Sequence, residues 1–424
     1  MRRRFLVVAG IVILAGGAAA AYLLTRDRFG GDVLGSSSGY VSTQTVRPPR
    51  ASDGIVSPMF GGVPQRLHVG DGHVRPPFRL AWTANGTSLV EFPPALAFHY
   101  LYYATLSGDL IAVSTKTGDR LWTEHVGHCE AAGPAVSTYH HGTVYETFLN
   151  HKPCKAGSQD PSDGLLLAIA AGRPHTVRWK RNLGASETSP LLLGSRLYIG
   201  TAAGDVYCLH ADNGKTIWHY HVPAPVKSAI AYDRGKVFFG AYDGRLYALG
   251  AAQGKLVWTA SSSRDFTGGS GRFYSTPAVA YARVYIGSTD GKVYAFDEST
   301  GKLVWAHATG AYVYGSPAVD DGRVYIGSYN HRFYALNAAT GETVWTFTAD
   351  GPISGSGSLV DGLVYFGSLG PPGGRRTYAL DARTGRKVWF WHDGGFGPVV
   401  TDGEKLYMVG WGKVYAFVPH KQRR

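Results

Sequence analysis

The chain alternates short apolar runs with turn residues at a regular spacing. One unit extends from Ser316 to Trp345, and each of its runs alternates apolar and polar positions and is rich in β-branched and aromatic residues. The strands predicted in this unit are 317–319, 323–328, 332–336 and 342–348. Asp321-Gly322, Tyr329-Asn330 and Thr340-Gly341 separate them as turns. A sheet of four such antiparallel strands is apolar on both faces, so it must stack on copies of itself.

A tryptophan closes each copy of this unit. The closing phrase reads YAFDESTGKLVW at 294–305 and YALDARTGRKVW at 378–389, with a glycine four residues before the tryptophan. The residues in this slot, spaced by about 40 positions, are Trp82, Trp122, Trp179, Trp218, Trp258, Trp305, Trp345 and Trp389. We expect each indole to pack between neighbouring sheets and to donate its N–H to a backbone carbonyl of the next one. The pattern predicts an all-β fold, an eight-bladed β-propeller of four-stranded antiparallel blades.

The two ends of the repeat region complement each other. Residues 397–418 supply three strands of a last blade without its tryptophan strand, and residues 77–84 form an orphan strand that contains Trp82. We therefore expect strand 77–84 to complete blade eight, which gives a propeller over 77–418. Three segments depart from the repeat: 146–163 in blade two, 261–272 before blade five and 369–376 in blade seven. They are either specificity loops or tolerated surface insertions.

The N-terminus predicts a membrane anchor. Residues 5–24 contain no charge and, at about 1.5 Å per residue, form a transmembrane helix long enough to cross a bilayer. Arg2, Arg3 and Arg4 favour a cytoplasmic N-terminus, with the propeller on the extracytoplasmic side of a bacterial cytoplasmic membrane. Small residues at 18–21 leave a cleaved signal peptide, and hence secretion, as the alternative. In this interpretation 1–28 is the anchor, 29–76 a Gly/Ser/Pro-rich linker that lifts the propeller off the membrane, and 419–424 a basic tail. The sequence leaves open whether part of 60–76 lies along the propeller.

Charge and cysteine content restrict the partners. The formal net charge is +12 and is dispersed, which suits anionic envelope polymers or lipid headgroups, and no basic run interleaved with aromatic residues suggests nucleic acid. Of three cysteines, Cys129 and Cys154 flank and enter the blade-two insertion, so a disulfide that pins it is expected outside the cytoplasm. Cys208 is expected to be a small buried residue. No metal-ligand spacing and no catalytic constellation stands out.

One mouth of the propeller channel is a candidate ligand site. The residues just before each innermost strand should surround the axis, and alignment on the SPAV motif selects Glu91, Phe92, Glu187, Lys227, Tyr274, Tyr314, Ser354 and Phe396. Aromatic rings with two glutamates and a lysine suit a small ligand or a peptide, whereas an ordinary mouth lining has the same composition. Arg264, Asp265 and Arg272 of the loop before blade five are candidates to overhang this mouth.

The repeat phrase, with SPAV and VYIGS before it, resembles the PQQ repeat of quinoprotein propellers over about residues 80–424. That superfamily includes PQQ-dependent alcohol dehydrogenases and the outer-membrane assembly factor BamB, and the resemblance implies an eight-bladed fold. A bound quinone needs Ca²⁺ on carboxylate and amide oxygens, a basic side chain over the ring and a carboxylate base. The dehydrogenases also have adjacent cysteines over the cofactor, whereas this sequence has no adjacent cysteine pair and no CxxCH motif.

We therefore predict no catalytic residues, no cofactor and no metal site, and place the chain closest in type to the BamB-like, non-catalytic members. The predicted function is a membrane-anchored scaffold that binds envelope proteins or anionic polymers. The alternatives are a dehydrogenase that uses PQQ with Ca²⁺ and a sensor that binds a small ligand or carbohydrate.

Overall fold

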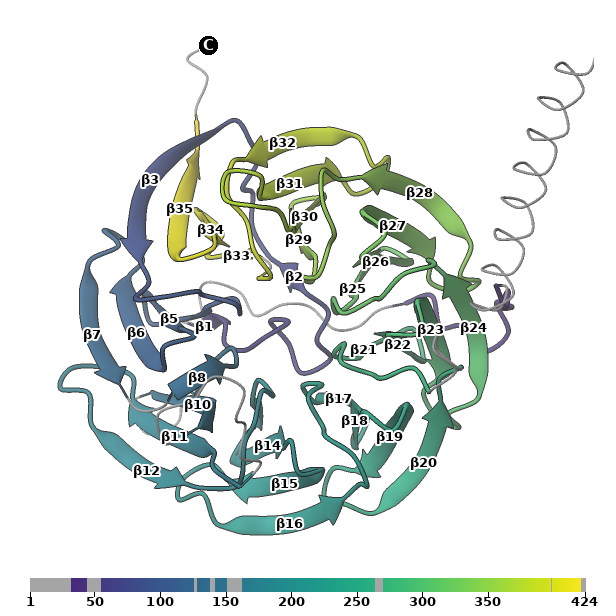
Figure 1. Cartoon of the computed structure of the whole chain (residues 1–424), viewed down its shortest axis with the longest axis horizontal. Helices are drawn as coiled ribbons and strands as arrows, with labels where there is room; N and C mark the ends of the chain where they lie inside the picture. Colours follow the sequence, from purple (N-terminus) through teal and green to yellow (C-terminus); the bar gives the residue numbers. More distant parts are fainter. Residues whose placement is uncertain are drawn as a thin grey trace, which may run out of the picture.

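Eight antiparallel sheets surround a central axis in the computed structural model of the chain (Figure 1). The structure describes residues 32–43, 55–125, 128–137, 142–150, 162–263, 270–397 and 399–420. We number the blades 1–8 in chain order and list the strands of each from the axis to the rim. The predicted eight-bladed propeller is confirmed, and in blade 6 each predicted strand boundary lies within one residue of the observed one.

Blades 1–4 contain the following strands. Blade 1 has β4 (Ala95–Ala97), β5 (Tyr100–Ala104), β6 (Asp109–Ser114) and β7 (Arg120–His125). Blade 2 has β9 (Ala135–Ser137), β10 (Thr143–Asn150), β11 (Leu165–Ala170) and β12 (Val177–Arg181), and β8 (His128–Ala131) also pairs with β10. Blade 3 has β13 (Leu191–Leu193), β14 (Arg196–Gly200), β15 (Asp205–His210) and β16 (Thr216–His221). Blade 4 has β17 (Ala231–Asp233), β18 (Lys236–Gly240), β19 (Arg245–Gly250) and β20 (Leu256–Ser261).

Blades 5–8 complete the ring. Blade 5 has β21 (Ala278–Ala280), β22 (Arg283–Gly287), β23 (Lys292–Asp297) and β24 (Leu303–Ala308). Blade 6 has β25 (Ala318–Asp320), β26 (Arg323–Gly327), β27 (Arg332–Asn337) and β28 (Thr343–Thr348). Blade 7 has β29 (Ser358–Val360), β30 (Leu363–Ser368), β31 (Arg376–Asp381) and β32 (Lys387–Trp391). Blade 8 has β33 (Val400–Thr401), β34 (Leu406–Val409), β35 (Lys413–Pro419) and, from the other end of the chain, β3 (Phe78–Asn85). The predicted composite blade is therefore confirmed, with Phe78 opposite Pro419 and Asn85 opposite Lys413.

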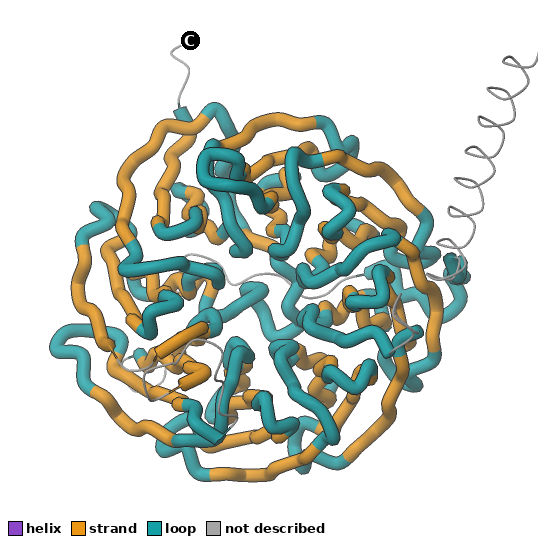
Figure 2. Tube along the Cα trace, viewed as in Figure 1, coloured by secondary structure: helices purple, strands orange, loops and turns teal. Residues whose placement is uncertain are grey.

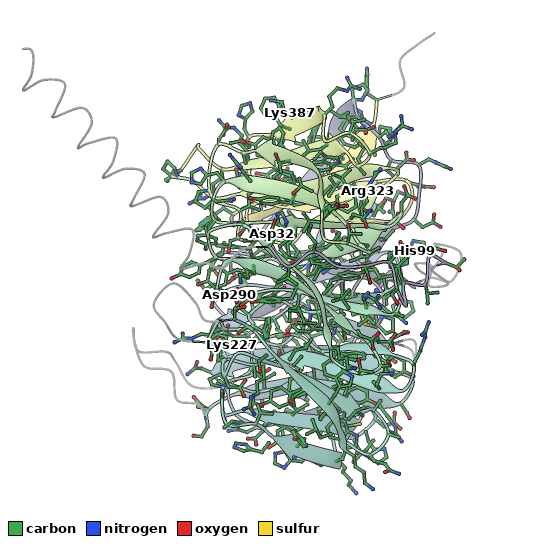
Figure 3. The ribbon with its side chains drawn as sticks, turned by 90° about the vertical axis from the view of Figure 1, so that its right-hand side faces the viewer. Asp32, His99, Lys227, Asp290, Arg323 and Lys387 are labelled. Carbon is green, nitrogen blue, oxygen red and sulfur yellow. The ribbon has the colours of Figure 1, made fainter. Side chains whose placement is uncertain are left out.

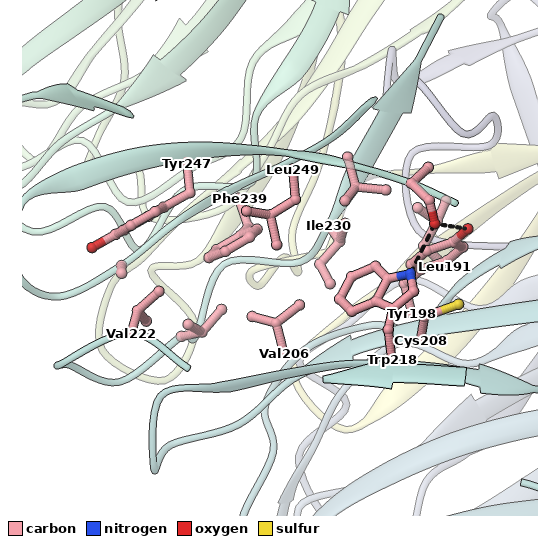
Figure 4. Close-up of a cluster of buried hydrophobic side chains, with 14 of the residues drawn as sticks. Leu191, Tyr198, Val206, Cys208, Trp218, Val222, Ile230, Phe239, Tyr247 and Leu249 are labelled. Carbon is pink, nitrogen blue, oxygen red and sulfur yellow. Dashed lines mark hydrogen bonds between the residues drawn. The ribbon is translucent and has the colours of Figure 1, made fainter. Parts of the chain in front are cut away.

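The slot tryptophans join each blade to the next. The indole nitrogen of Trp218 donates to Ala251 O at 2.9 Å, and the same carbonyl accepts the hydroxyl of Tyr198 at 3.1 Å. Figure 4 shows Trp218 and Tyr198 in the buried cluster between blades 3 and 4. Equivalent bonds to the following blade are made by Trp82, Trp122, Trp179, Trp258, Trp305 and Trp345. The prediction of interblade N–H···O=C bonds is confirmed at these positions.

The repeat glycine is required by the tryptophan of the preceding blade. A Cβ on Gly254 would lie 2.6 Å from Trp218, and its φ of +69° also disfavours a side chain. Trp389 differs, because the third and fourth strands of blade 8, β35 and β3, come from distant parts of the chain and are not joined by this turn. Trp389 instead packs edge-on against Phe78 at 5.3 Å and against Phe417 at 5.4 Å.

We expect Gly254→Ala to lower the free energy of unfolding by about 2–4 kcal/mol, because overpacking against Trp218 adds to the cost of a positive φ. Gly235→Ala is the matched control, since Gly235 has a φ of +78° and a Cβ added there would meet no atom within 4 Å. The control isolates backbone strain and should cost about 1–2 kcal/mol. Denaturant unfolding of both variants measures the difference, and equal losses would show that the ring contact is unimportant.

The segment 55–70, which we call the plug, lies in the channel and is not a linker. Its carbonyls accept N–H bonds from the central residue of five innermost strands, and Figure 2 shows this loop crossing the centre of the ring. The donor–acceptor pairs are Val136 to Pro58, Tyr232 to Pro64, Val279 to Gln65, Val319 to Leu67 and Leu359 to His68. β1 (Ile55–Ser57) pairs with β4 and β2 (Val69–Gly70) with β29, so the plug covers inner edges that would otherwise be exposed.

Arg66 fixes the plug from inside. Its side chain is fully buried and donates to Ile230 O at 2.9 Å, to Ser189 O and Pro190 O at 3.1 Å, and to Phe60 O. Burial lowers its pKa to about 9, and burial together with the charge of Arg66 lowers the pKa of His68 to about 3. The composition of this segment suggested a linker, yet its prolines and glycines shape a turn that presents carbonyls to the blades.

The segment 32–43, which we call the latch, lies on the outside of blades 5 and 6. Val33 forms an antiparallel bridge with Ala306 of β24, and Arg283 donates to the carbonyls of Ser38 and Gly39. This part of the predicted linker is therefore also packed on the propeller. Residues 44–54 lie outside the described residues.

Several sequence predictions fall on parts of the chain that the structure does not describe. The predicted transmembrane stretch 5–24 is among them, as are residues 421–424 of the basic tail, Cys154 and the side chain of Cys129. Within the described ranges no helix has the length and apolar character to cross a bilayer. The insertion in blade 2 begins later than predicted, because residues 146–150 belong to β10. Cys208 is buried as expected.

Glu146 is a buried carboxyl in a position that blades 3, 5 and 6 give to isoleucine. It is the counterpart of Ile286 and Ile326, and its Oε1 accepts only the N–H of Thr147, at 2.9 Å. Its Oε2 has no partner among the described residues. Burial raises the pKa of Glu146 well above 4.5.

We expect Glu146→Ile to stabilise the propeller by about 1–3 kcal/mol at pH 8, because an unsatisfied buried polar group is removed. Above pH 4.5 the unfolded chain releases this proton while the native state retains it, so wild-type stability falls as pH rises toward the raised pKa. Glu146→Gln should remove this dependence of stability on pH, but it should not add the stability that the apolar isoleucine side chain gives. Urea unfolding between pH 4 and pH 9 tests both statements, and an unchanged slope in Glu146→Gln would contradict them.

Candidate binding site at the mouth of the propeller

The predicted mouth residues surround one cavity at one end of the channel. Each lies just before an innermost strand, so successive blades present these side chains to the axis. All eight line this cavity: Glu91, Phe92, Glu187, Lys227, Tyr274, Tyr314, Ser354 and Phe396. Figure 3 shows Lys227 on this side, which we call the mouth face, and His99 and Arg323 on the opposite side, the far face.

The plug forms the floor of the mouth. Phe60 lines the cavity and lies edge-on to Phe92 at 6.3 Å between ring centroids. The space above it measures about 60 Å³ and is open to solvent, with room for a few water molecules. The mouth is therefore a shallow depression with a closed floor.

A chain of hydroxyls ties the blades together around the throat. Ser356 Oγ accepts the N–H of Ser316 at 2.9 Å, Ser316 Oγ accepts that of Thr276 at 3.0 Å, and Thr276 Oγ1 accepts that of Ala229 at 3.1 Å. Across the ring, Ser189 Oγ accepts the N–H of Gly133 at 2.9 Å. Because each hydroxyl bonds to the blade before it, these contacts hold the mouth residues in fixed positions.

Glu187 and Lys227 form an ion pair at the wall of the cavity. The Glu187 side chain is 4% exposed and that of Lys227 is 19% exposed. Tyr274 also donates its hydroxyl to Glu187, at 3.4 Å. A buried carboxylate that is satisfied by an ammonium and a hydroxyl is stable without an external ligand.

Five tyrosines on blades 4–6 form a continuous half-buried surface, which we call the tyrosine cluster: Tyr242, Tyr274, Tyr312, Tyr314 and Tyr329. Ring centroids lie 6.4 Å apart for 242–274, 5.7 Å for 274–314, 5.5 Å for 312–314 and 5.1 Å for 314–329. Burial raises the pKa of Tyr314, so its hydroxyl stays a neutral hydrogen-bond group. Half-buried tyrosines supply large, rigid contact area at low entropic cost, as in protein-binding surfaces.

Basic and aromatic residues extend this surface. Arg272 lies 5.4 Å from the centre of the Tyr242 ring, so its predicted place near the mouth agrees with the structure; Arg264 and Asp265 lie outside the described residues. On blades 7 and 8, Arg375 stacks 3.5 Å above Trp411, which packs on Phe396 at 5.8 Å.

Sequence reasoning missed part of this surface. Tyr242, Tyr329 and Trp411 stand in the turns between the second and third strands of their blades. We treated Tyr329 only as a turn residue and gave Tyr242 and Trp411 no role. Aromatic residues beside Asp-Gly and Asn turns were the available signal. For Phe60 there was no such signal, because nothing in the Gly/Pro-rich sequence around it indicated that this segment enters the channel.

The strands that flank the three departures from the repeat have their adjoining ends on the mouth face. The segments connect β10 to β11, β20 to β21 and β30 to β31. Innermost strands run away from the mouth, so in an antiparallel blade the second strand ends, the third begins and the outermost ends on the mouth side. Of the segments themselves, the structure describes 369–376 in full.

The mouth residues do not fit a quinone with its metal ion. A space of about 60 Å³ is far below the several hundred Å³ of a typical cofactor pocket. The lysine of the cavity is paired with Glu187. Within the described ranges, no three His, Cys, Asp or Glu side chains converge as a metal site.

Comparison with known proteins gives one family, and the relatives include BamB and quinone-dependent alcohol dehydrogenases. The family model PQQ_2, described as "Outer membrane protein assembly factor BamB", matches residues 162–313 and 289–421, which is more than half of the chain. BamB of Yersinia pestis is 31% identical over 276 residues, covering 58% of this chain and 61% of the relative. The dehydrogenase subunit of the quinone alcohol dehydrogenase of Gluconobacter oxydans is 38% identical over 84 residues, covering 17% of this chain and 11% of the relative. The chain therefore spans only a small part of the length of that dehydrogenase.

Solved structures of both groups share the fold. BamB from Moraxella catarrhalis superposes with a TM-score of 0.63 at 20% identity, covering 82% of this chain and 99% of that one. A europium-containing methanol dehydrogenase gives a TM-score of 0.68 at 12% identity, covering 87% and 99%. At these identities the likeness shows the eight-bladed architecture alone.

Proposed function

Because the chain belongs to the PQQ-repeat family of β-propellers, we propose that it is a non-catalytic scaffold of the bacterial cell envelope that binds proteins at its mouth face. The observation that carries this proposal is the closed floor of the mouth. With Phe60 beneath it, the mouth offers an aromatic surface and not a chamber for a cofactor. The relatives named as assembly factors support a role in the envelope.

The chemistry of the mouth favours a protein over an anionic polymer. The lining of the cavity contains two carboxylates, Glu91 and Glu187, and its lysine, Lys227, is ion-paired with Glu187. Tyrosine, tryptophan and arginine are the residues that dominate binding energy at protein interfaces, and the mouth face gathers all three. A scaffold with this surface would recognise the folded or extended segments of envelope proteins.

In this proposal the N-terminal stretch 5–24 anchors the propeller close to the membrane. Asp32 is fixed on blade 5, where its Oδ1 accepts the N–H of Ala308 at 2.7 Å. Only residues 25–31 separate Asp32 from the predicted membrane stretch, and a chain of that length reaches about 25 Å at most. The anchor therefore keeps the propeller near the bilayer, whereas a free linker 29–76 would have lifted it away.

We expect the double variant Tyr274→Ser with Tyr314→Ser to lose captured partners. Affinity purification of the full chain from its own cells, quantified by mass spectrometry, should show about a ten-fold decrease in specific partners, since two central aromatic anchors are removed. Tyr220→Ser, at the rim on β16, is the matched control and should retain them. Equal recovery from both variants would contradict binding at the mouth.

The dehydrogenase alternative rests on the quinone alcohol dehydrogenase relatives. Titration of the purified full chain with PQQ and Ca²⁺ distinguishes the two functions. The scaffold proposal predicts no saturable change in quinone absorbance and no reduction of an electron-accepting dye by alcohols. Stoichiometric binding with turnover would replace the proposal.

A further inference from the structure

The groove between blades 5 and 6 holds a segment of the chain itself. Val33 N donates to Ala306 O at 2.8 Å, and Ala306 N donates to Val33 O at 2.9 Å, so the latch adds to the free edge of β24. Two residues later Gly35 N donates to Thr340 O of blade 6 at 2.9 Å. The latch therefore binds both blades in the manner of an added β-strand.

Arg283 recognises the backbone of the latch further along. Its guanidinium donates to Ser38 O at 2.6 Å and to Gly39 O at 3.2 Å. Tyr40 then packs on Tyr281 with 5.1 Å between ring centroids. These carbonyls belong to a turn, because Tyr40 N donates to Ser37 O at 3.0 Å and Gly39 has a φ of +69°. This part of the groove is therefore suited to a glycine-containing turn that follows the edge pairing.

The groove between blades 6 and 7 repeats this arrangement and contains an open cavity of about 370 Å³. Arg323 and Tyr325 are the repeat counterparts of Arg283 and Tyr285, because they hold the same places in β26 and β22. The cavity is lined by Asp320, Asp321, Arg323, Tyr325, Asp361, Gly362, Ala382 and Arg383, together with residues of the plug and β29. It lies on the far face, where Figure 3 places Arg323.

The edge of blade 6 is available to such a segment. In the described part of the chain β28 pairs only with β27. Val344 on β28 is 44% exposed, and Trp345 is half-buried, whereas the latch helps to cover Trp305 completely. The edge and apolar contacts that the latch makes with blade 5 therefore have exposed counterparts on blade 6, and Arg323 uses one guanidinium nitrogen to donate to Ala382 O at 3.3 Å.

The charges at the two grooves differ at one end. Asp321 stands in blade 6 where Tyr281 stands in blade 5, and it faces the cavity together with Asp361. Arg75 lies 3.8 Å and His73 3.5 Å from Asp361, both at exposed positions. Asp361 is thus already paired with Arg75. In place of the stacking surface for Tyr40, this groove offers the carboxylate of Asp321, which suits a basic side chain.

We propose that the groove between blades 6 and 7 binds a segment of a partner protein that, like the latch, pairs with a strand edge and then turns. The segment pairs with the edge of β28, its carbonyls accept hydrogen bonds from Arg323, and a basic side chain at the position equivalent to Tyr40 meets Asp321. This site is separate from the mouth and is reached from the far face.

Two labelled peptides test the proposal on the full chain. One has the sequence of residues 32–43, and the other carries lysine in place of its tyrosine. Fluorescence anisotropy should show saturable binding of the lysine peptide, at least about ten-fold tighter than the tyrosine peptide. Arg323→Ala and Asp321→Asn should each weaken it by about ten-fold, and hydrogen exchange in β28 should slow on binding.

Arg332→Ala is the matched control, because Arg332 is an exposed arginine on the neighbouring strand β27. It should leave the affinity unchanged. Equal affinities in Arg323→Ala and Arg332→Ala would overturn the proposal, as would equal binding of the two peptides. Self-association of the chain through Val33–Tyr40 of a second copy, without peptide binding, would also overturn it. None of these results bears on partner capture by the mouth, so the two proposals fail separately.

Discussion

Arg66→Met is expected to lower the free energy of unfolding by about 3–5 kcal/mol, because buried carbonyls would lose a charged donor. Arg66 is the only described side chain of the plug that donates to Phe60, to blade 3 and to blade 4 at once. Its loss should also free the segment that forms the floor of the mouth. Guanidinium unfolding measures the first effect, and protease cleavage within residues 55–70 of the native protein measures the second.

Arg66→Lys is the control for charge. Lysine keeps the positive charge but cannot direct donors to carbonyls on several sides, so it should recover less than half of the lost stability. Full recovery would mean that charge alone holds the plug. A wild-type protease pattern in Arg66→Met would contradict the role of this side chain in closing the channel.

Trp305→Ala is expected to cost about 3–5 kcal/mol, the range for removal of a buried aromatic side chain. Trp305 is 0% exposed, donates to Ala338 O at 3.0 Å and packs against Gly341 of the next blade. It also lies beneath the latch, because a Cβ on Gly35 would be 2.9 Å from its ring. The same unfolding experiment gives the loss, and proteolysis within residues 32–43 reports release of the latch.

Trp345→Ala separates the contribution of the interblade contact from the contribution of the latch. Trp345 makes the same bond to the next blade, at 3.0 Å to Ala382 O, but it is only half-buried. We expect Trp345→Ala to lower the free energy of unfolding by about 1–2 kcal/mol less than Trp305→Ala does, because less buried surface is lost. Equal losses, with the latch still protected from protease in Trp305→Ala, would show that the latch adds nothing to blade 5.

The architecture follows from the sequence because the same physical constraint is repeated in each blade. Trp218 needs a glycine beside it and a carbonyl for its N–H, and the turn of the next blade provides both. The orphan strand with Trp82 could be assigned to blade 8 for the same reason. The plug and the latch are single segments without a repeat, and they bind mainly through backbone carbonyls. Their Gly, Ser and Pro content therefore resembled that of a linker.

The part of the candidate site that follows the repeat was also predictable from the sequence. Glu187, Lys227 and Tyr274 converge because each occupies one repeated position before an innermost strand. Tyr312 and Tyr329 escaped notice because their contribution depends on how neighbouring loops pack above that ring. Which residues close the channel was not predictable either, since Phe60 reaches the axis only through the turn held by Arg66.

The central claim is that the mouth face binds proteins, and photocrosslinking tests it most directly. A photoreactive amino acid is placed at Tyr314 of the full chain in intact cells, with Val257, 50% exposed at the rim of blade 4, as the control position. The account predicts discrete protein adducts from position 314 that decrease by about ten-fold when Tyr329 is replaced by serine. Adducts of equal yield from both positions, or only with glycans or lipids from position 314, would contradict it.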